Sequence, residues 1–196
     1  YQKESSEQPI KLQNCVLICN GEIYNWKEIH KHLNIESSTG SDCECIIHAY
    51  KRYGIKYTLN LLDGVFSFLL YDKETQNIFI ARDPYGVRPL FIGASDDDDF
   101  FCVASELKMI SDFKNLDIHN YHVKQFKPGT YTRLKADSKV IEITEYYKSQ
   151  LIENVLLTDE ENALHSIRTN LIRAVSKRVE NTDRDIACLL SGGLDS

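Results

Sequence analysis

Short apolar runs and stretches of helical periodicity alternate along the chain and predict an α+β fold. Residues 15–20 form an apolar run of strand-forming residues, and the turn dipeptide Asn20-Gly21 is expected to close this buried strand. After residue 64 the apolar runs are short, rich in β-branched and aromatic residues, and separated by polar linkers at hairpin spacing. The strands expected there cover residues 65–71, 78–81, 90–93, 100–104 and 140–143, with turns at 72–77, 96–99 and 128–129.

Two helices are expected between the first strand and this strand-rich region. The first covers about residues 25–33, and Asn25 and Glu28 have the spacing of a capping box. The second begins near Asp42, which is its N-cap candidate, and stops at Gly54.

The composition changes near residues 149–159, which we interpret as a domain boundary. Residues 1–150 are expected to form one domain, and residues 151–196 a linker and the beginning of a second. In the second part, a long amphipathic helix is predicted from about Asp159 to Glu180. A strand candidate follows at residues 185–190 and leads into a glycine-rich turn.

The composition limits the class of protein. Of the 196 residues, 42% are hydrophobic and 27% are charged, which is ordinary for a globular protein and excludes disordered, collagen-like and disulfide-stapled classes. The net charge of −6 argues against binding to nucleic acid or an anionic membrane, and no apolar run approaches the ~20 residues of a membrane helix. Six cysteines, mostly within apolar or amphipathic runs, are expected to be reduced thiols in a cytoplasmic protein.

The string Ser191–Ser196 (SGGLDS) follows the predicted strand and is a candidate phosphate-binding loop. Paired glycines and small hydroxyl residues expose backbone N–H groups in a concave turn, which suits a phosphate chain. The alternative is a tight turn that needs glycine only for its backbone geometry. The string resembles the pyrophosphate loop of ATP pyrophosphatases, and Asp195 is a candidate for helping to hold Mg²⁺. The resemblance implies these ATP-binding residues: Leu190, Ser191, Gly192, Gly193, Asp195 and Ser196.

Asn20-Gly21-Glu22 is the second candidate for chemistry. An amide side chain beside a glycine N–H can direct two donors at one point, as an oxyanion hole requires. The alternative is an ordinary hairpin or strand-to-helix turn. The longer string Asn20–Asn25 resembles the glutaminase domain of class II glutamine amidotransferases, and further motifs follow in order. These are Gly40-Ser41-Asp42, Glu44-Cys45-Ile46-Ile47, Leu62–Phe68, Ala81–Leu90, Ala104–Lys108 and Pro128-Gly129.

With Ser191–Ser196 downstream, this motif order is similar to the glutamine-hydrolysing asparagine synthetase family of the eukaryotic type, from about Gln8 to the last residue. The resemblance implies an N-terminal-nucleophile hydrolase fold, a four-layer αββα sandwich that is incomplete at its N-terminus. It also implies that an α/β ATP-pyrophosphatase domain begins in residues 151–196.

The resemblance also implies roles for individual residues. Asn20 and Gly21 match the oxyanion pair, Glu22 belongs to the same glutamine-contacting segment, and Asp42 matches the carboxylate that recognises the substrate's α-amino group. The family's nucleophile is an amino-terminal cysteine, expected upstream of the first residue, so the 196 residues alone are expected to be inactive. Cys15 and Cys19 are expected to be core thiols.

In that family glutamine supplies ammonia, aspartate reacts with MgATP to give aspartyl-AMP and pyrophosphate, and ammonia then displaces AMP. The expected partners are therefore glutamine, aspartate, ATP and Mg²⁺, with no nucleic acid and no membrane, and a homodimer is compatible with the resemblance. Three alternatives stay open: another class II amidotransferase of the phosphoribosylpyrophosphate or glucosamine-phosphate type, a β-lactam synthetase relative, and a non-catalytic glutamine-binding module.

Other polar residues are assigned structural roles. Arg82 and Arg88 are expected to be structural ion-pair residues. His30 and His32 should point apart on one helix, and Cys43-x-Cys45 lacks a second pair of ligands, so no metal site is expected from the histidines or these cysteines.

Overall fold

Strand β2 (Cys15–Ile23) shows how the sequence pattern produces the sheet. Side chains alternate between the two faces of a strand, and the odd-numbered apolar residues of β2 are buried. The expected turn at Asn20-Gly21 is wrong, because the strand continues through these two residues to Ile23. The neighbouring strand β3 (Gly64–Asp72) is long enough to pair with β2 along its whole length.

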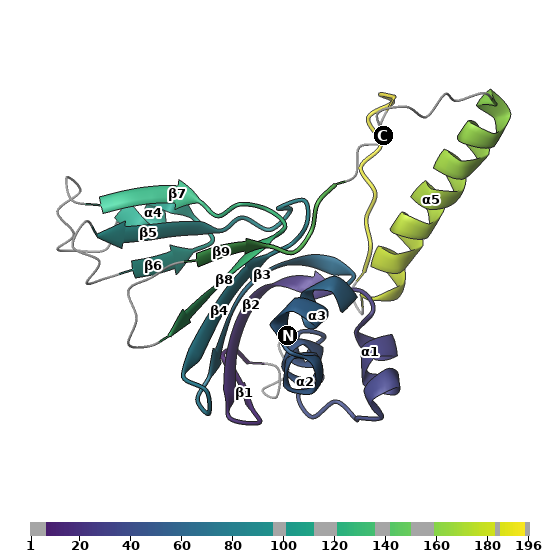
Figure 1. Cartoon of the computed structure of the whole chain (residues 1–196). Helices are drawn as coiled ribbons and strands as arrows, with labels where there is room; N and C mark the ends of the chain where they lie inside the picture. Colours follow the sequence, from purple (N-terminus) through teal and green to yellow (C-terminus); the bar gives the residue numbers. More distant parts are fainter. Residues whose placement is uncertain are drawn as a thin grey trace. The chain divides into compact units, whose positions relative to one another are not determined.

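The computed structural model describes residues 7–95, 101–111, 121–135, 142–149, 159–182 and 185–194 (Figure 1). The chain divides into two compact units, Tyr1–Ser149 and Gln150–Ser196. In the described part of the chain, no helix combines the length and the apolar character needed to cross a membrane.

The first unit contains two antiparallel sheets. The larger has the order β1-β2-β3-β4-β8-β9, and the smaller has the order β6-β5-β7. A hairpin joins β3 to β4, and β8 pairs antiparallel with β9, so these sequential strands are neighbours. The remaining strands are β1 (Ile10–Leu12), β4 (Asn77–Arg82), β5 (Phe91–Ser95), β6 (Phe101–Ala104), β7 (Tyr121–Gln125), β8 (Thr130–Lys135) and β9 (Glu142–Glu145).

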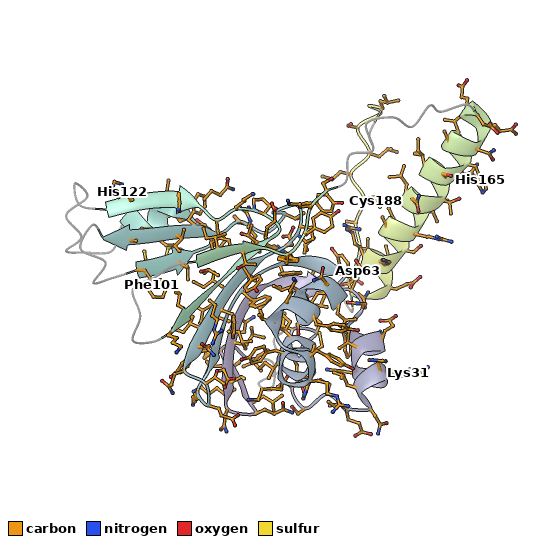
Figure 2. The ribbon with its side chains drawn as sticks, viewed as in Figure 1. Lys31, Asp63, Phe101, His122, His165 and Cys188 are labelled. Carbon is orange, nitrogen blue, oxygen red and sulfur yellow. The ribbon has the colours of Figure 1, made fainter. Side chains whose placement is uncertain are left out.

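Helices α1 (Trp26–Leu33), α2 (Glu44–Tyr53) and α3 (Ile55–Leu61) cover one face of the larger sheet (Figure 1). Their apolar residues and those of β2 and β3 form the main core, and side chains fill the space between these helices and the sheet (Figure 2). A second core cluster joins residues of the two sheets, for example Ile80 of β4 and Ile92 of β5. Helix α4 (Leu107–Ser111) follows β6 and contacts it.

The two predicted helix starts differ in detail from the structure. Asn25 is at the N-cap of α1, but no capping box forms, because its side chain is used elsewhere. Its amide donates to the carbonyl of Leu61 and accepts from the backbone N–H of Asp63, which ties α1 to the end of α3. Asp42 is not the cap of α2, whose N-cap position is Cys43.

The second unit contains helix α5 (Glu160–Glu180), as predicted from its periodicity. Asp159 is its N-cap and accepts a hydrogen bond from the backbone N–H of Asn162. The buried strand predicted at residues 185–190 is wrong: these residues form no strand, and Leu189 is 95% exposed. A strand needs a partner for its backbone hydrogen bonds, and the described part of this unit offers only a helix.

Candidate functional site

The candidate glutamine site is built on the last residues of β2. Asn20, Gly21 and Glu22 pair with residues 65–67 of β3, so a regular ladder sets the direction of their backbone groups. Gly21 is needed there for close approach rather than for a turn. A Cβ atom on Gly21 would lie 2.5 Å from the carbonyl oxygen of Val65 and 2.8 Å from the Cα of Phe66.

The backbone N–H of Gly21 points away from β3. Opposite residues in an antiparallel ladder exchange either both hydrogen bonds or neither. Phe66, which is opposite Gly21, uses its own backbone groups on Asp83: its N–H donates to Oδ2 (3.2 Å), and its carbonyl accepts from the Asp83 N–H (2.8 Å). The N–H of Gly21 is therefore directed to the other edge of β2.

Two neighbouring N–H groups define that edge. The N–H of Cys19 donates to Gln8 Oε1 and the N–H of Ile23 donates to Asp42 Oδ2, both at 2.7 Å. Alternate residues of a strand direct their N–H groups to the same edge, so the Gly21 donor lies between these two bonds. An anionic oxygen at this edge would meet a fixed backbone donor.

The side chain of Asn20 faces the smaller sheet. Its Nδ2 donates to Ser105 Oγ at 3.2 Å, and Ser105 directly follows β6. Both residues line a cavity of about 270 Å³ between the sheets, together with residues such as Ser67 and Leu90. Asp42 is not among the residues that line this cavity.

Asp42 nevertheless lies beside the same strand end. Its bond to the N–H of Ile23 places a carboxylate two residues beyond Gly21, so residues 20–22 and Asp42 come together from two segments of the chain. The Asp42 carboxylate carries the negative charge that an ammonium group requires as a partner. This contact is the tertiary link between the two motifs.

Sequence reasoning assigned no role to Glu44, which organises the loop that carries Asp42. Glu44 is completely buried, and its carboxylate accepts bonds from Ser37, Ser38 and Thr39, including the backbone N–H groups of Ser38 and Thr39. Burial raises its pKa, but the hydrogen bonds from Ser38, Thr39 and His48 lower it more, so the pKa lies below the usual glutamate range. The sequence did contain a signal for this role. Glu44 is the first residue of its helix, and the hydroxyl residues Ser37-Ser38-Thr39 shortly before it are typical donors to a nearby carboxylate.

Glu22 forms an ion pair with Arg88 at 3.2 Å, as expected for Arg88. Asp83 positions Arg88, because its carboxylate accepts from the backbone N–H groups of Tyr85, Val87 and Arg88. Asp83 thus connects to the site twice, through Phe66 behind Gly21 and through Arg88 beside Glu22.

Arg82 is also structural, but backbone carbonyls rather than a carboxylate hold it. Its guanidinium donates to the carbonyl oxygens of Gly86, Arg88 and Phe126, each at 2.7 Å, and the side chain is buried. These three bonds shape the loop after β4 from inside.

The buried cysteines are core thiols. Cys15 and Cys19 lie on the buried face of β2, and all six cysteines of the chain are free. Burial raises the pKa of Cys15 to about 11, so its thiol stays protonated at neutral pH and is a poor nucleophile. Cys43 and Cys45 also have raised pKa values: a hydrogen bond with Cys19 is the main cause for Cys43, and burial for Cys45.

The candidate phosphate loop is exposed where the structure describes it. Residues Leu190–Leu194 are all exposed, and Gly192 adopts a φ of 79° that favours glycine. The N–H of Gly193 donates to Ser191 Oγ at 3.4 Å, so the two ends of the turn are linked. Asp195 and Ser196 lie outside the described residues.

His30 and His32 point apart on α1, as expected, but His30 also meets a third histidine. His32 is exposed, and its Nε2 lies 3.1 Å from the hydroxyl oxygen of Tyr53. His30 is buried next to His48 of α2. The prediction considered only the pair His30 and His32 and missed His48, because a contact between two helices has no fixed spacing in the sequence.

Comparison with known proteins places these features in context. Residues 2–128 match the family model of the glutamine amidotransferase domain. The asparagine synthetase [glutamine-hydrolyzing] of Pongo abelii is 40% identical over 206 residues, which cover 96% of this chain and 36% of the relative. The protein of the same name from Homo sapiens is 39% identical with the same coverage. The chain therefore spans about a third of the length of these relatives.

Solved structures confirm the fold predicted for the larger part of the chain, whereas the α/β ATP-pyrophosphatase domain expected to begin in residues 151–196 is not seen in the described residues. Glutamine phosphoribosylpyrophosphate amidotransferase from B. subtilis, complexed with ADP and GMP, superimposes with a TM-score of 0.61 at 24% identity. The match covers 76% of this chain and 34% of that chain. A structure described as the allosteric regulatory enzyme of purine biosynthesis has a TM-score of 0.63 at 24% identity, covering 76% and 33%. At this identity the likeness concerns the fold.

Proposed function

Because the chain belongs to the class II glutamine amidotransferase family, we propose that the end of β2 binds glutamine and stabilises the oxyanion formed when its side-chain amide is hydrolysed. Attack on the amide carbon moves negative charge to the carbonyl oxygen. Asn20 Nδ2 and the N–H of Gly21 are the proposed donors to this oxygen, and the substrate would replace Ser105 Oγ as the partner of Asn20.

Asp42 is proposed to bind the α-ammonium group of glutamine, and Glu22 to contact glutamine from the same strand end. The observation that carries this proposal is the 2.7 Å bond between Asp42 Oδ2 and the N–H of Ile23. It holds a carboxylate at the strand end that carries the proposed oxyanion donors. Cys15 and Cys19 are not proposed as nucleophiles, because both are buried in β2.

We further propose that the full-length protein is an asparagine synthetase. The names of the relatives and the Ser191–Ser196 string support aspartate and ATP as its other substrates, with Mg²⁺ as the metal and Asp195 as a residue that would help to hold it. The residues proposed to contact ATP are those named above, from Leu190 to Ser196. Reduced cysteines favour a cytoplasmic location, and a homodimer fits this proposal.

Asp42→Asn tests the glutamine site in the full-length protein. The variant keeps an oxygen for the Ile23 N–H but loses the charge, and a hydrogen bond to a charged group contributes about 1.5–3 kcal/mol, so the KM for glutamine should rise about 10- to 100-fold. Asparagine formation from ammonia should be unchanged. Glu36→Gln, which changes an exposed acid in the same connection between α1 and α2, is the matched control. Equal loss with both nitrogen donors would show that Asp42 acts through folding instead.

Asn20→Ala tests the oxyanion donor. Loss of one such donor costs about 10²–10³ in kcat, so glutamine hydrolysis should slow by this factor while ammonia-dependent activity is retained. Asn60→Ala is the control, since the side chain of Asn60 is exposed and donates to the carbonyl of Lys56 in its own helix. A glutaminase kcat within a factor of two of the wild type would exclude Asn20 as a donor.

The proposed synthetase reaction has its own test. The full-length protein should exchange labelled pyrophosphate into ATP when aspartate and Mg²⁺ are present, and glutamate in place of aspartate should not support the exchange. If glutaminase activity were normal but no aspartate-dependent exchange occurred, the proposed glutamine site would stand and the proposed synthetase reaction would be wrong.

A further inference from the structure

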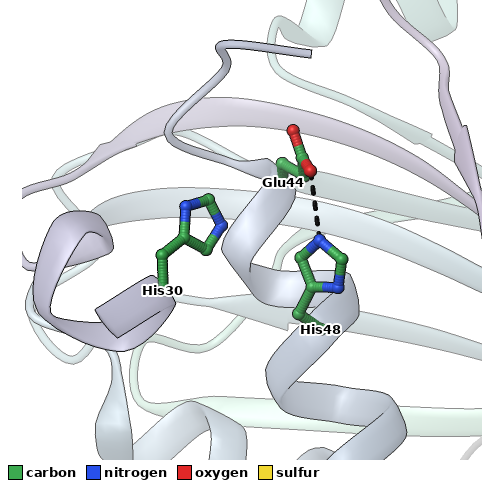
Figure 3. A group of neighbouring side chains, drawn as sticks. All are labelled: His30, Glu44 and His48. Atoms are coloured by element: carbon green, nitrogen blue, oxygen red, sulfur yellow. Dashed lines mark hydrogen bonds and ion pairs between the residues drawn. The ribbon is translucent and has the colours of Figure 1, made fainter. Parts of the chain in front are cut away.

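Three potential metal ligands meet in the interior between α1 and α2. His30 comes from α1, and Glu44 and His48 lie one turn apart on α2 (Figure 3). One ligand atom from each residue lies within 4.8 Å of the other two, and His48 Nε2 is 3.1 Å from Glu44 Oε1. All three side chains are more than nine-tenths buried.

His30 is the residue whose position is otherwise unexplained. Its Nε2 is buried and has no hydrogen-bond partner among the residues that the structure describes, although a buried polar atom without a partner destabilises a protein by about 1–3 kcal/mol. Figure 3 shows its ring pointing from α1 toward Glu44 and His48. The ring centroids of His30 and His48 are 5.6 Å apart, so a ligand between the two imidazoles would supply the missing partner.

We propose that His30, Glu44 and His48 bind a zinc ion that ties α1 to α2. Two imidazole nitrogens and one carboxylate oxygen are a donor set that suits Zn²⁺, and a water would complete a tetrahedron. Zn–ligand bonds of about 2.0–2.1 Å place tetrahedral ligand atoms roughly 3.3 Å apart. The 3.1 Å between His48 Nε2 and Glu44 Oε1 is close to this spacing, and a small movement of α1 would bring His30 to it.

Gln13 supplies a second layer around the proposed site. Its side-chain amide lies 3.2 Å from His48 Nδ1. Turned to present its oxygen, the amide would accept the Nδ1 proton and leave the lone pair of Nε2 for the metal, as partners of metal-bound histidines commonly do. Gln13 is exposed, so the proposed site is one side chain away from solvent.

The carboxylate has the charge and the freedom for this role. Oε2 accepts hydrogen bonds from Ser37 and Thr39, and these can persist when zinc binds. Oε1 accepts from Ser38 and from His48, and zinc would replace the His48 proton as its partner. Because Asp42 belongs to the same loop, zinc would also stiffen the connection that carries this carboxylate.

Zinc titration of the 196-residue chain, without a histidine tag and after treatment with EDTA, tests the proposal. We expect one Zn²⁺ per chain with sub-micromolar affinity in competition with a chromophoric chelator. We also expect a higher melting temperature than in EDTA, and a visible absorption band typical of tetrahedral coordination when Co²⁺ replaces Zn²⁺. Binding below 0.1 equivalent, or no change in melting temperature, would overturn the proposal.

Variants locate the bound ion. His30→Gln should weaken zinc affinity at least 100-fold, whereas His32→Gln, on the exposed face of the same helix, should bind as the wild type does. Gln13→Ala keeps all three ligands and should weaken affinity about 10- to 100-fold, which gives a second readout if His30→Gln does not fold. If Gln13→Ala and a folded His30→Gln both bound zinc with the affinity of the wild type, zinc would bind elsewhere and the proposed site would be rejected.

Discussion

At the residue scale, Glu44 shows how one buried charge can organise a functional loop. A carboxylate without solvent is tolerated only when donors replace the lost water, and three successive residues, 37–39, supply them. The loop then leads to Asp42, whose carboxylate reaches the end of β2. Glu44 is therefore a positioning residue for the proposed glutamine site, although it does not line it.

This arrangement predicts a pH-dependent contribution to stability. The pKa of Glu44 is lower in the folded than in the unfolded chain, so its stabilisation is complete above its ordinary value of 4.5 and is lost as the pH falls below it. Glu44→Gln should lower the free energy of unfolding by about 2–3 kcal/mol at pH 7 and by much less near pH 3.

Urea unfolding between pH 3 and pH 7 in the presence of EDTA measures this difference. Glu28→Gln, which changes an exposed acid on α1, is the control and should differ little from the wild type at every pH. A difference between wild type and Glu44→Gln that does not vary with pH would mean that the charge of Glu44 does not stabilise the fold.

At the element scale, β2 has two roles. Its buried residues belong to the core between the larger sheet and the helices, and its last residues carry the proposed site. Gly21 of β2 and Gly64 of β3 leave no room for a side chain, because a Cβ atom at either position would lie within 3.0 Å of backbone atoms of the opposite strand. These two glycines lie at the end of β2 that carries the proposed site.

Gly21→Ala is therefore expected to destabilise the chain. The added Cβ would meet the backbone of Val65 and Phe66, which cannot move as a flexible side chain could, and overpacking of this kind costs about 1–3 kcal/mol. The midpoint of urea unfolding should fall accordingly. Ile18→Ala, at a half-exposed position of the same strand, should cost less than about 1 kcal/mol because it removes little buried surface. A Gly21→Ala variant as stable as the wild type would contradict the proposed reason for glycine.

At the scale of the whole molecule, the two units differ in how they bury apolar surface. Both described core clusters consist of residues between Ile10 and Tyr147, all in the first unit. In the second unit, α5 has no buried residue, and its apolar stripe, which includes Leu164, Ile167 and Leu171, is more than half exposed. Figure 2 shows His165 on the same helix.

Deletion of residues 150–196 should therefore leave the first unit folded. We expect the urea midpoint and the near-ultraviolet circular dichroism of residues 1–149 to match those of the whole chain, because the core clusters remain intact. A fall in the midpoint by more than the experimental error would show that the second unit stabilises the first.

Local pattern was sufficient for the elements whose neighbours follow directly in the sequence. Strands β3 and β4 were predicted because a polar linker at hairpin spacing separates two apolar runs, and α5 because periodicity and Asp159 mark its course and start. The short strand β1 and helix α3 were not predicted. The strand expected at residues 185–190 failed because an apolar run does not itself provide a partner strand.

For the candidate site, the sequence by itself determined the residue types: an amide beside a glycine on β2, and an acid in the loop before α2. It could do so because these groups belong to short motifs whose chemistry does not depend on distant neighbours. Only the tertiary structure decided that Asp42 bonds to Ile23, that Glu44 holds the loop, and that His30 meets His48. These contacts join segments that are distant in the sequence, and their spacing in the sequence does not predict how close they lie in space. Packing of the helices on the sheet brings them together.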